Sequence, residues 1–106
     1  MAFYLVRARP RTDKLAELEE RLRAEAFVDL EPFGRALTKG LRNARVEGAG
    51  AVWEEEDYCS PPLAEERAAV LDGYFDGLAV EPVTQGHGWQ QIASLPLLFP
   101  KLTEPT

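Results

Sequence analysis

Hydrophobic and polar residues alternate at the start of the chain as they do in a β-strand. Over residues 2–8, aromatic and branched side chains occupy both faces. Phe3, Leu5 and Arg7 share one face, and Tyr4, Val6 and Ala8 share the other. Pro10 is expected to end the strand, because it has no amide proton to donate to a neighbouring strand.

The apolar residues then recur at helical spacing. Thr12 is expected to cap a first helix, with Asp13 in its first turn. Its buried stripe is expected to be Leu15, Leu18, Leu22 and Ala26. A second helix, or an irregular continuation of the first, is expected from Asp29. Its stripe consists of Leu30, Phe33, Leu37 and Leu41.

The middle of the chain predicts a hairpin and a third helix. Gly48-Ala49-Gly50 separates two extended arms, residues 44–47 and 51–59. Ser60-Pro61-Pro62 is typical of a helix start, and Gly77 of a helix end. The predicted stripe between them is Leu63, Val70, Leu71, Tyr74 and Phe75.

The end of the chain predicts a last strand, a loop and an apolar tail. Residues 78–83 form the strand, which Pro82 restricts to an edge or a strand end. Residues 86–89 are expected in a loop, followed by a short helical turn over 90–94 and the tail 95–99. The order predicts one α+β domain over residues 1–106, a ferredoxin-like βαββαβ two-layer α/β sandwich with a C-terminal apolar tail.

Charge is divided unevenly along the chain. Residues 1–46 hold ten Lys/Arg and seven Asp/Glu, whereas residues 47–106 hold two Lys/Arg and eleven Asp/Glu, for a net charge of −6. The basic pole is Arg7, Arg9 and Arg11, and the acidic pole is the run 54–57. In the predicted topology the first strand pairs antiparallel with the third, so we expect the two poles to lie close together.

Composition excludes several classes of function. The acidic balance argues against non-specific nucleic-acid binding. The apolar run at residues 2–6 is too short for a membrane span or a signal peptide, and Cys59 is the only cysteine. We therefore expect a cytoplasmic protein with no membrane or nucleic-acid partner. Nine Arg against three Lys and a single Asn favour a thermophile or a high-GC bacterium.

The acidic run carries the main candidate chemistry. Alternation places Glu55 and Asp57 on one face of the strand and Glu54 and Glu56 on the other. They are either structural partners of arginines or a carboxylate pair for acid–base chemistry or a hard cation. The candidate catalytic residues are Glu55, Asp57, Tyr58 and His87. We expect no cofactor and no resident metal, since no second His or Cys stands at ligand spacing.

Cys59 precedes the predicted third helix. The helix dipole would lower the pKa of its thiol, whereas the four preceding acids would raise it. We therefore interpret Cys59 as a small buried apolar residue.

The tail must be covered by other apolar surface. It docks either on its own sheet or in a second subunit, and we favour the second, since a two-layer sandwich leaves one sheet face bare. A homo-oligomer is therefore expected through Leu95, Leu97, Leu98 and Phe99.

Two short segments resemble a known family. Ser94-Leu95-Pro96-Leu97-Leu98-Phe99-Pro100 is similar to a stretch of the muconolactone isomerases, and Phe3-Tyr4-Leu5-Val6-Arg7 to their first strand. The resemblance covers about a tenth of the chain and implies a dimeric ferredoxin-like fold. Here the apolar run follows the last strand instead of preceding it, and no catalytic residue is carried over.

The sequence thus favours a homo-oligomeric binding or interaction module without catalysis, with a small molecule or a protein as its partner. The alternative is a small cofactor-independent enzyme of the dimeric α+β-barrel type. That alternative requires its candidate residues to converge in one pocket.

Overall fold

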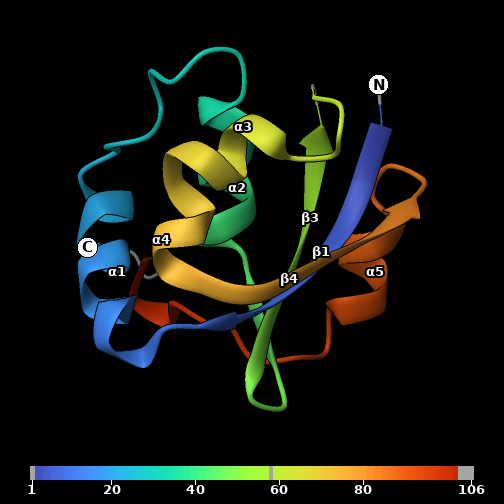
Figure 1. The fold of residues 1–106 in the computed structure, drawn as a ribbon. Coiled ribbons are helices and arrows are strands. Elements are labelled where there is room, and N and C mark those ends of the chain that lie inside the picture. The colour runs from blue at the N-terminus through green and yellow to red at the C-terminus, as the bar shows by residue number, and fades with distance from the viewer. Residues whose placement is uncertain (1, 58, 103–106) are drawn as a thin grey trace.

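The fold is a four-stranded antiparallel sheet with helices on both faces (Figure 1). The computed structural model describes residues 2–57 and 59–102. The strands are β1 (Ala2–Pro10), β2 (Arg45–Glu47), β3 (Gly50–Asp57) and β4 (Phe75–Val83), in the order β2-β3-β1-β4. The predicted α+β class is confirmed, and so is the antiparallel pairing of the first strand with the third. β4 is an edge strand, as Pro82 requires.

Most of the helical structure covers one face of the sheet (Figure 1). It comprises the turn η1 (Thr12–Lys14), α1 (Leu15–Arg23), α2 (Gly34–Arg42), α3 (Ala64–Glu66), the wider turn η2 (Arg67–Leu71) and α4 (Asp72–Tyr74). The main core lies beneath these elements. Its fully buried members include Val6, Leu18, Leu22, Leu37, Leu41, Trp53, Leu63 and Leu71.

The other face is covered by α5 (His87–Ile92), and η3 (Pro100–Leu102) ends the described chain. Under α5 lies a smaller core of Leu5, Val52 and Ile92, with Trp89 and Leu95 packed against it. Residues 86–89 are expected as a loop, but Gly86 is the N-cap of this helix and residues 87–89 form its first turn.

Two glycines allow these helices to approach the sheet closely. A Cβ on Gly40 of α2 would lie 2.9 Å from the Trp53 ring and 3.2 Å from the Glu54 carbonyl oxygen. A Cβ on Gly88 of α5 would lie 2.8 Å from Glu54 Oε1. β2 pairs with β3 only as far as Val52. Beyond that residue, Gly40 of α2 lies against Trp53 and Glu54 of β3.

Several predicted helix boundaries are wrong. Thr12 lies inside η1 and no side chain caps α1, which ends at Arg23 and leaves Ala26 exposed. The second helix begins at Gly34 instead of Asp29, and Leu30 is 37% exposed. The cause is a tight turn, in which the Gly34 amide bonds the Leu30 carbonyl and a Cβ would meet the carbonyl oxygen of Phe27 at 2.3 Å.

The third helix also differs from expectation. No side chain caps α3, and Leu63 precedes it in a left-handed conformation. The helix ends at Tyr74, and β4 begins at Phe75. Gly77 therefore lies within a strand, where its positive φ favours glycine over any residue with a side chain.

The charge poles do not meet, although their strands pair. The antiparallel register places Arg7 opposite Val52 and the acids of β3 opposite residues 2–5. Arg7 instead bonds Glu47 of β2 and Glu81 of β4, and Arg11 bonds Asp76. Arg7 therefore links β1 to β2 across the intervening β3 and to the adjacent β4, and the acidic run is left to other partners.

The tail packs within its own chain. Phe99 is 4% exposed in the main core. The Leu98 amide bonds the Ala44 carbonyl and the Val46 amide bonds the Pro96 carbonyl, each at 2.8 Å. Leu97 forms a bridge with Arg45 at the outer edge of β2. Docking on its own fold, the less favoured alternative, accounts for the buried Phe99. Leu95, Leu97 and Leu98 stay half-buried, although Leu95 and Leu98 each pack against a core.

Within the described residues, no helix has both the length and the apolar character needed to span a membrane.

Candidate functional site

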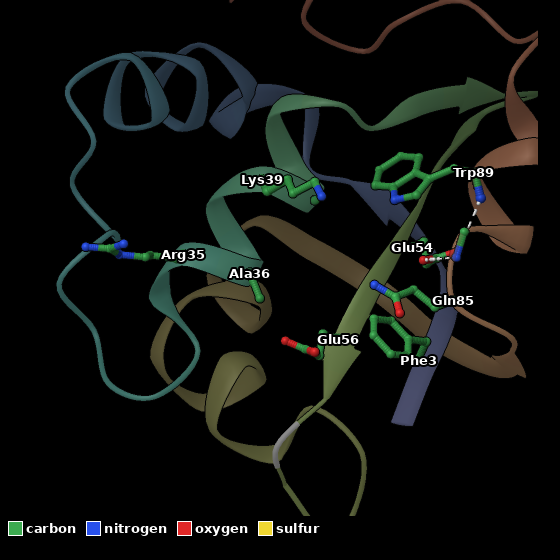
Figure 2. Close-up of a pocket in the computed structure, with 10 residues that line it drawn as sticks. Phe3, Arg35, Ala36, Lys39, Glu54, Glu56, Gln85 and Trp89 are labelled. Atoms are coloured by element: carbon green, nitrogen blue, oxygen red, sulfur yellow. Dashed lines mark hydrogen bonds between the residues drawn. The ribbon is translucent and has the colours of Figure 1, made fainter. Parts of the chain in front are cut away.

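A cleft of about 370 Å³ opens between α2 and α5, above the acidic end of β3 (Figure 2). β1 contributes Phe3, and α5 with the turn before it contributes Gln85 and Trp89. Arg35, Ala36 and Lys39 line the cleft from α2, and Glu54 and Glu56 line it from β3. The volume lies within the range of about 300–1,000 Å³ that is usual for small-molecule sites.

The charged side chains that line the cleft point in different directions. Lys39 extends from α2 toward the side of the cleft that holds Trp89, whereas the Arg35 guanidinium stands farther out at the rim (Figure 2). Glu56 points from β3 toward α2 (Figure 2). Within residues 2–57 and 59–102, the Lys39 ammonium and the Arg35 guanidinium form no ion pair. The cleft is therefore lined by the Lys39 ammonium, the Glu56 carboxylate and the rings of Phe3 and Trp89.

Glu54 has a structural role in the floor of the cleft. Its Oε1 accepts the amides of Gly88 at 2.8 Å and Trp89 at 3.3 Å, and its Oε2 accepts the Gly86 amide at 2.9 Å. A carboxylate at this position satisfies amides that have no partner within the helix, and it interacts favourably with the helix dipole. Glu54 thereby fixes α5 and the wall that carries Trp89.

Glu55 lies on the opposite face of β3, within the main core. It is 2% exposed, and its Oε1 accepts the Trp53 indole N–H at 2.8 Å. Burial raises the pKa of Glu55 to about 8, and the neighbouring Glu66 adds to the increase. At neutral pH this carboxyl is therefore mostly protonated.

Asp57 and Cys59 lie at the end of the same face, beside Glu66 of α3. Asp57 Oδ1 accepts the amides of Cys59 at 3.0 Å and Leu63 at 2.9 Å. The Cys59 thiol donates to Glu66 Oε1 at 3.4 Å. Burial raises the pKa of Cys59, and the hydrogen bond to Glu66 acts in the same direction. The increase in the thiol pKa that the sequence predicts is present, but the acids that contribute to it lie in α3 and not in the strand.

The predicted catalytic residues do not converge. Glu55 and Asp57 share one face of the sheet, whereas His87 is exposed at the start of α5 on the other. Tyr58 lies outside the described residues. Glu55, Asp57 and His87 do not line the cleft. An enzyme mechanism that combines them is therefore not supported by this geometry.

Sequence reasoning misses Lys39 on α2, which resembles any exposed residue of an amphipathic helix. It allows Trp89 in a ligand pocket but favours a packing role for the ring and places the residue in a loop. Gly40 and Gly88 carry the one available signal, since a glycine inside a helix often marks close approach to a neighbour. No family model, curated protein or solved structure matches this chain.

Proposed function

We propose that this protein is a non-catalytic binding module for a small zwitterion with an apolar body, the chemistry of a free hydrophobic amino acid. The observation that carries the proposal is the lining of the cleft between α2 and α5. An ammonium and a carboxylate stand beside two aromatic rings in one cavity.

Each part of such a ligand has a complementary group. Lys39 would bind the ligand carboxylate, and the Glu56 carboxylate would bind the ligand ammonium. Phe3 and Trp89 would contact the apolar body, and an aromatic body would gain from ring packing. The protein carries a net charge of −6, which disfavours approach of a simple anion but affects a neutral zwitterion little.

The experiment compares three ligands that share a phenylethyl body and differ in the charged groups they carry. Phenylalanine carries both charges, 3-phenylpropionate only the carboxylate, and phenethylamine only the ammonium. Binding is followed by NMR through the indole N–H of Trp89. We expect saturable binding of phenylalanine, with each single-charge ligand weaker by about tenfold for the loss of one charged hydrogen bond.

Two variants assign the contacts. Lys39→Gln should weaken phenylalanine and 3-phenylpropionate but leave phenethylamine unchanged, and Glu56→Gln should do the reverse. Lys101→Gln is the matched control, because this exposed lysine does not line the cleft. If none of the three ligands shifts the Trp89 signal, or Lys39→Gln affects none of them, the proposal is wrong.

We also propose the ferredoxin-like description of the fold and self-association through the tail. The order β2-β3-β1-β4 supports the first, because the connections β1 to β2 and β3 to β4 each cross one intervening strand. The half-buried Leu95 and Leu97 support the second. The single cysteine is compatible with the cytoplasm as the proposed compartment.

A further inference from the structure

A second polar cluster lies on the helical face of the sheet, apart from the cleft. Asp57, Cys59 and Glu66 each offer one ligand atom, and these atoms all lie within 4.8 Å of one another. Glu66 is fully buried and Asp57 is 7% exposed, whereas Cys59 is half-buried. Glu55 contacts Glu66 from the neighbouring position on β3.

No ion pair within the described part of the chain balances the acids of this cluster. Within residues 2–57 and 59–102, no Lys, Arg or His forms an ion pair with Glu55, Asp57 or Glu66. In the same residues, Oε2 of Glu55 and Oε2 of Glu66 are buried without a hydrogen-bond partner. Burying a carboxylate oxygen without a partner costs free energy unless a proton or a cation binds to it.

We propose that Asp57, Cys59 and Glu66 bind a divalent transition-metal ion, Zn²⁺ by preference. The thiolate selects against Ca²⁺ and Mg²⁺, which take oxygen ligands only. Tetrahedral zinc with bonds of roughly 2.0–2.3 Å separates its ligand atoms by roughly 3.3–3.8 Å. The three ligand atoms lie within 4.8 Å of one another, so side-chain movements of about an ångström would bring them to these separations.

The surrounding contacts suit such a site. The amides of Cys59 and Leu63 hold Asp57 Oδ1. Hydrogen bonds of this kind orient metal ligands in proteins. The half-buried Cys59 gives the ion a route from solvent. On binding, the thiol releases its proton to solvent and sulfur forms the metal bond, so affinity should rise with pH.

The test uses the untagged protein, treated with chelator and then desalted. Titration with Co²⁺ is followed by near-ultraviolet absorption, where a cobalt–thiolate bond gives a charge-transfer band, and Zn²⁺ is then used to displace the cobalt. We expect one ion per chain, a thiolate band, and displacement by Zn²⁺.

Two ligand variants and one control decide the outcome. Cys59→Ser should abolish the thiolate band, and Glu66→Gln should weaken Co²⁺ binding at least about tenfold. Glu65→Gln, an exposed neighbour, should leave binding unchanged. Circular dichroism of each variant checks that it is folded.

The proposal is overturned if wild type binds no Co²⁺, or binds it without the thiolate band. If wild type binds no Co²⁺ and Glu66→Gln also raises the unfolding temperature, the buried carboxyl groups share a proton instead of a metal ion.

Discussion

Glu54 and Glu55 are neighbours in the sequence but meet opposite surroundings across β3. Glu54 accepts three amides at the start of α5, which compensate its negative charge. Glu55 accepts one indole N–H and lies beside another buried acid. One carboxylate therefore stabilises the fold as an anion, whereas the other is favoured in its neutral form.

Removing the charge of Glu54 should loosen α5. In Glu54→Gln, the amide NH₂ group replaces one acceptor oxygen and faces N–H donors, so that at least one buried amide loses its partner. We expect a loss of about 1–3 kcal/mol in the free energy of unfolding, measured by chemical denaturation. Amide hydrogen exchange at residues 86–89 should also quicken. Glu81→Gln, which alters only an exposed ion pair, should lie close to wild type.

The raised pKa of Glu55 predicts a pH dependence of stability. The unfolded carboxyl titrates near 4.5 and the folded one at about 8. Between these values the folded state holds a proton that the unfolded state has lost, so the free energy of unfolding should fall as pH rises and level off above about 8. Glu55→Gln in chelator should remove this slope and be more stable than wild type in alkali. An unchanged slope in that variant would assign the titration to another group.

At the scale of elements, close packing of helices on the sheet decides where the cleft forms. Gly88→Ala should place a methyl group 2.8 Å from Glu54 Oε1 and 3.2 Å from Leu5, and it should destabilise the fold by about 1–3 kcal/mol through overpacking. Gly73→Ala is the matched helical control, because a Cβ there meets nothing within 4 Å. It should be neutral or slightly stabilising. Equal unfolding free energies for the two variants would show that α5 does not rest on Glu54.

Tyr74 joins α4 to α1. Its hydroxyl donates to Glu17 Oε2 at 2.6 Å and accepts from Arg21 Nη1 at 2.9 Å. The hydroxyl lowers the pKa of Glu17, so this contribution to stability is present above the unfolded pKa and is lost as pH falls through the folded one. Tyr74→Phe should lower the unfolding temperature at neutral pH, with a smaller difference in acid. NMR titration should show the pKa of Glu17 returning toward its ordinary value.

Sequence pattern located the strands better than the site, for physical reasons. The position of each strand follows from period-2 alternation of apolar and polar residues and from glycine or proline near its ends. These signals lie in neighbouring residues. Helix starts such as Gly34 depend on backbone contacts to Phe27 and Leu30, which no spacing rule encodes. Glu66 joins Asp57 only after the chain turns back at Leu63, so the acidic cluster has no sequence motif.

At the scale of the whole molecule, self-association is limited by how much of the tail stays exposed. Phe99 is buried in its own core, so the exposed parts of Leu95, Leu97 and Leu98 are what the tail offers to a second copy. A stable interface covers about 800 Å² on each partner, and three half-buried leucines supply a small part of that. We therefore expect a weak, concentration-dependent dimer.

Native mass spectrometry and sedimentation over a range of concentrations measure this association directly. Leu97→Asp should shift the equilibrium to monomer while the protein stays folded, because that side chain is only half-buried. Leu30→Asp is the control, since Leu30 is equally apolar and more exposed but lies far from the tail in the sequence. A wild type that stays monomeric at every concentration would remove the homo-oligomer from the proposed function. The cleft between α2 and α5 would then have to bind its ligand within a single chain.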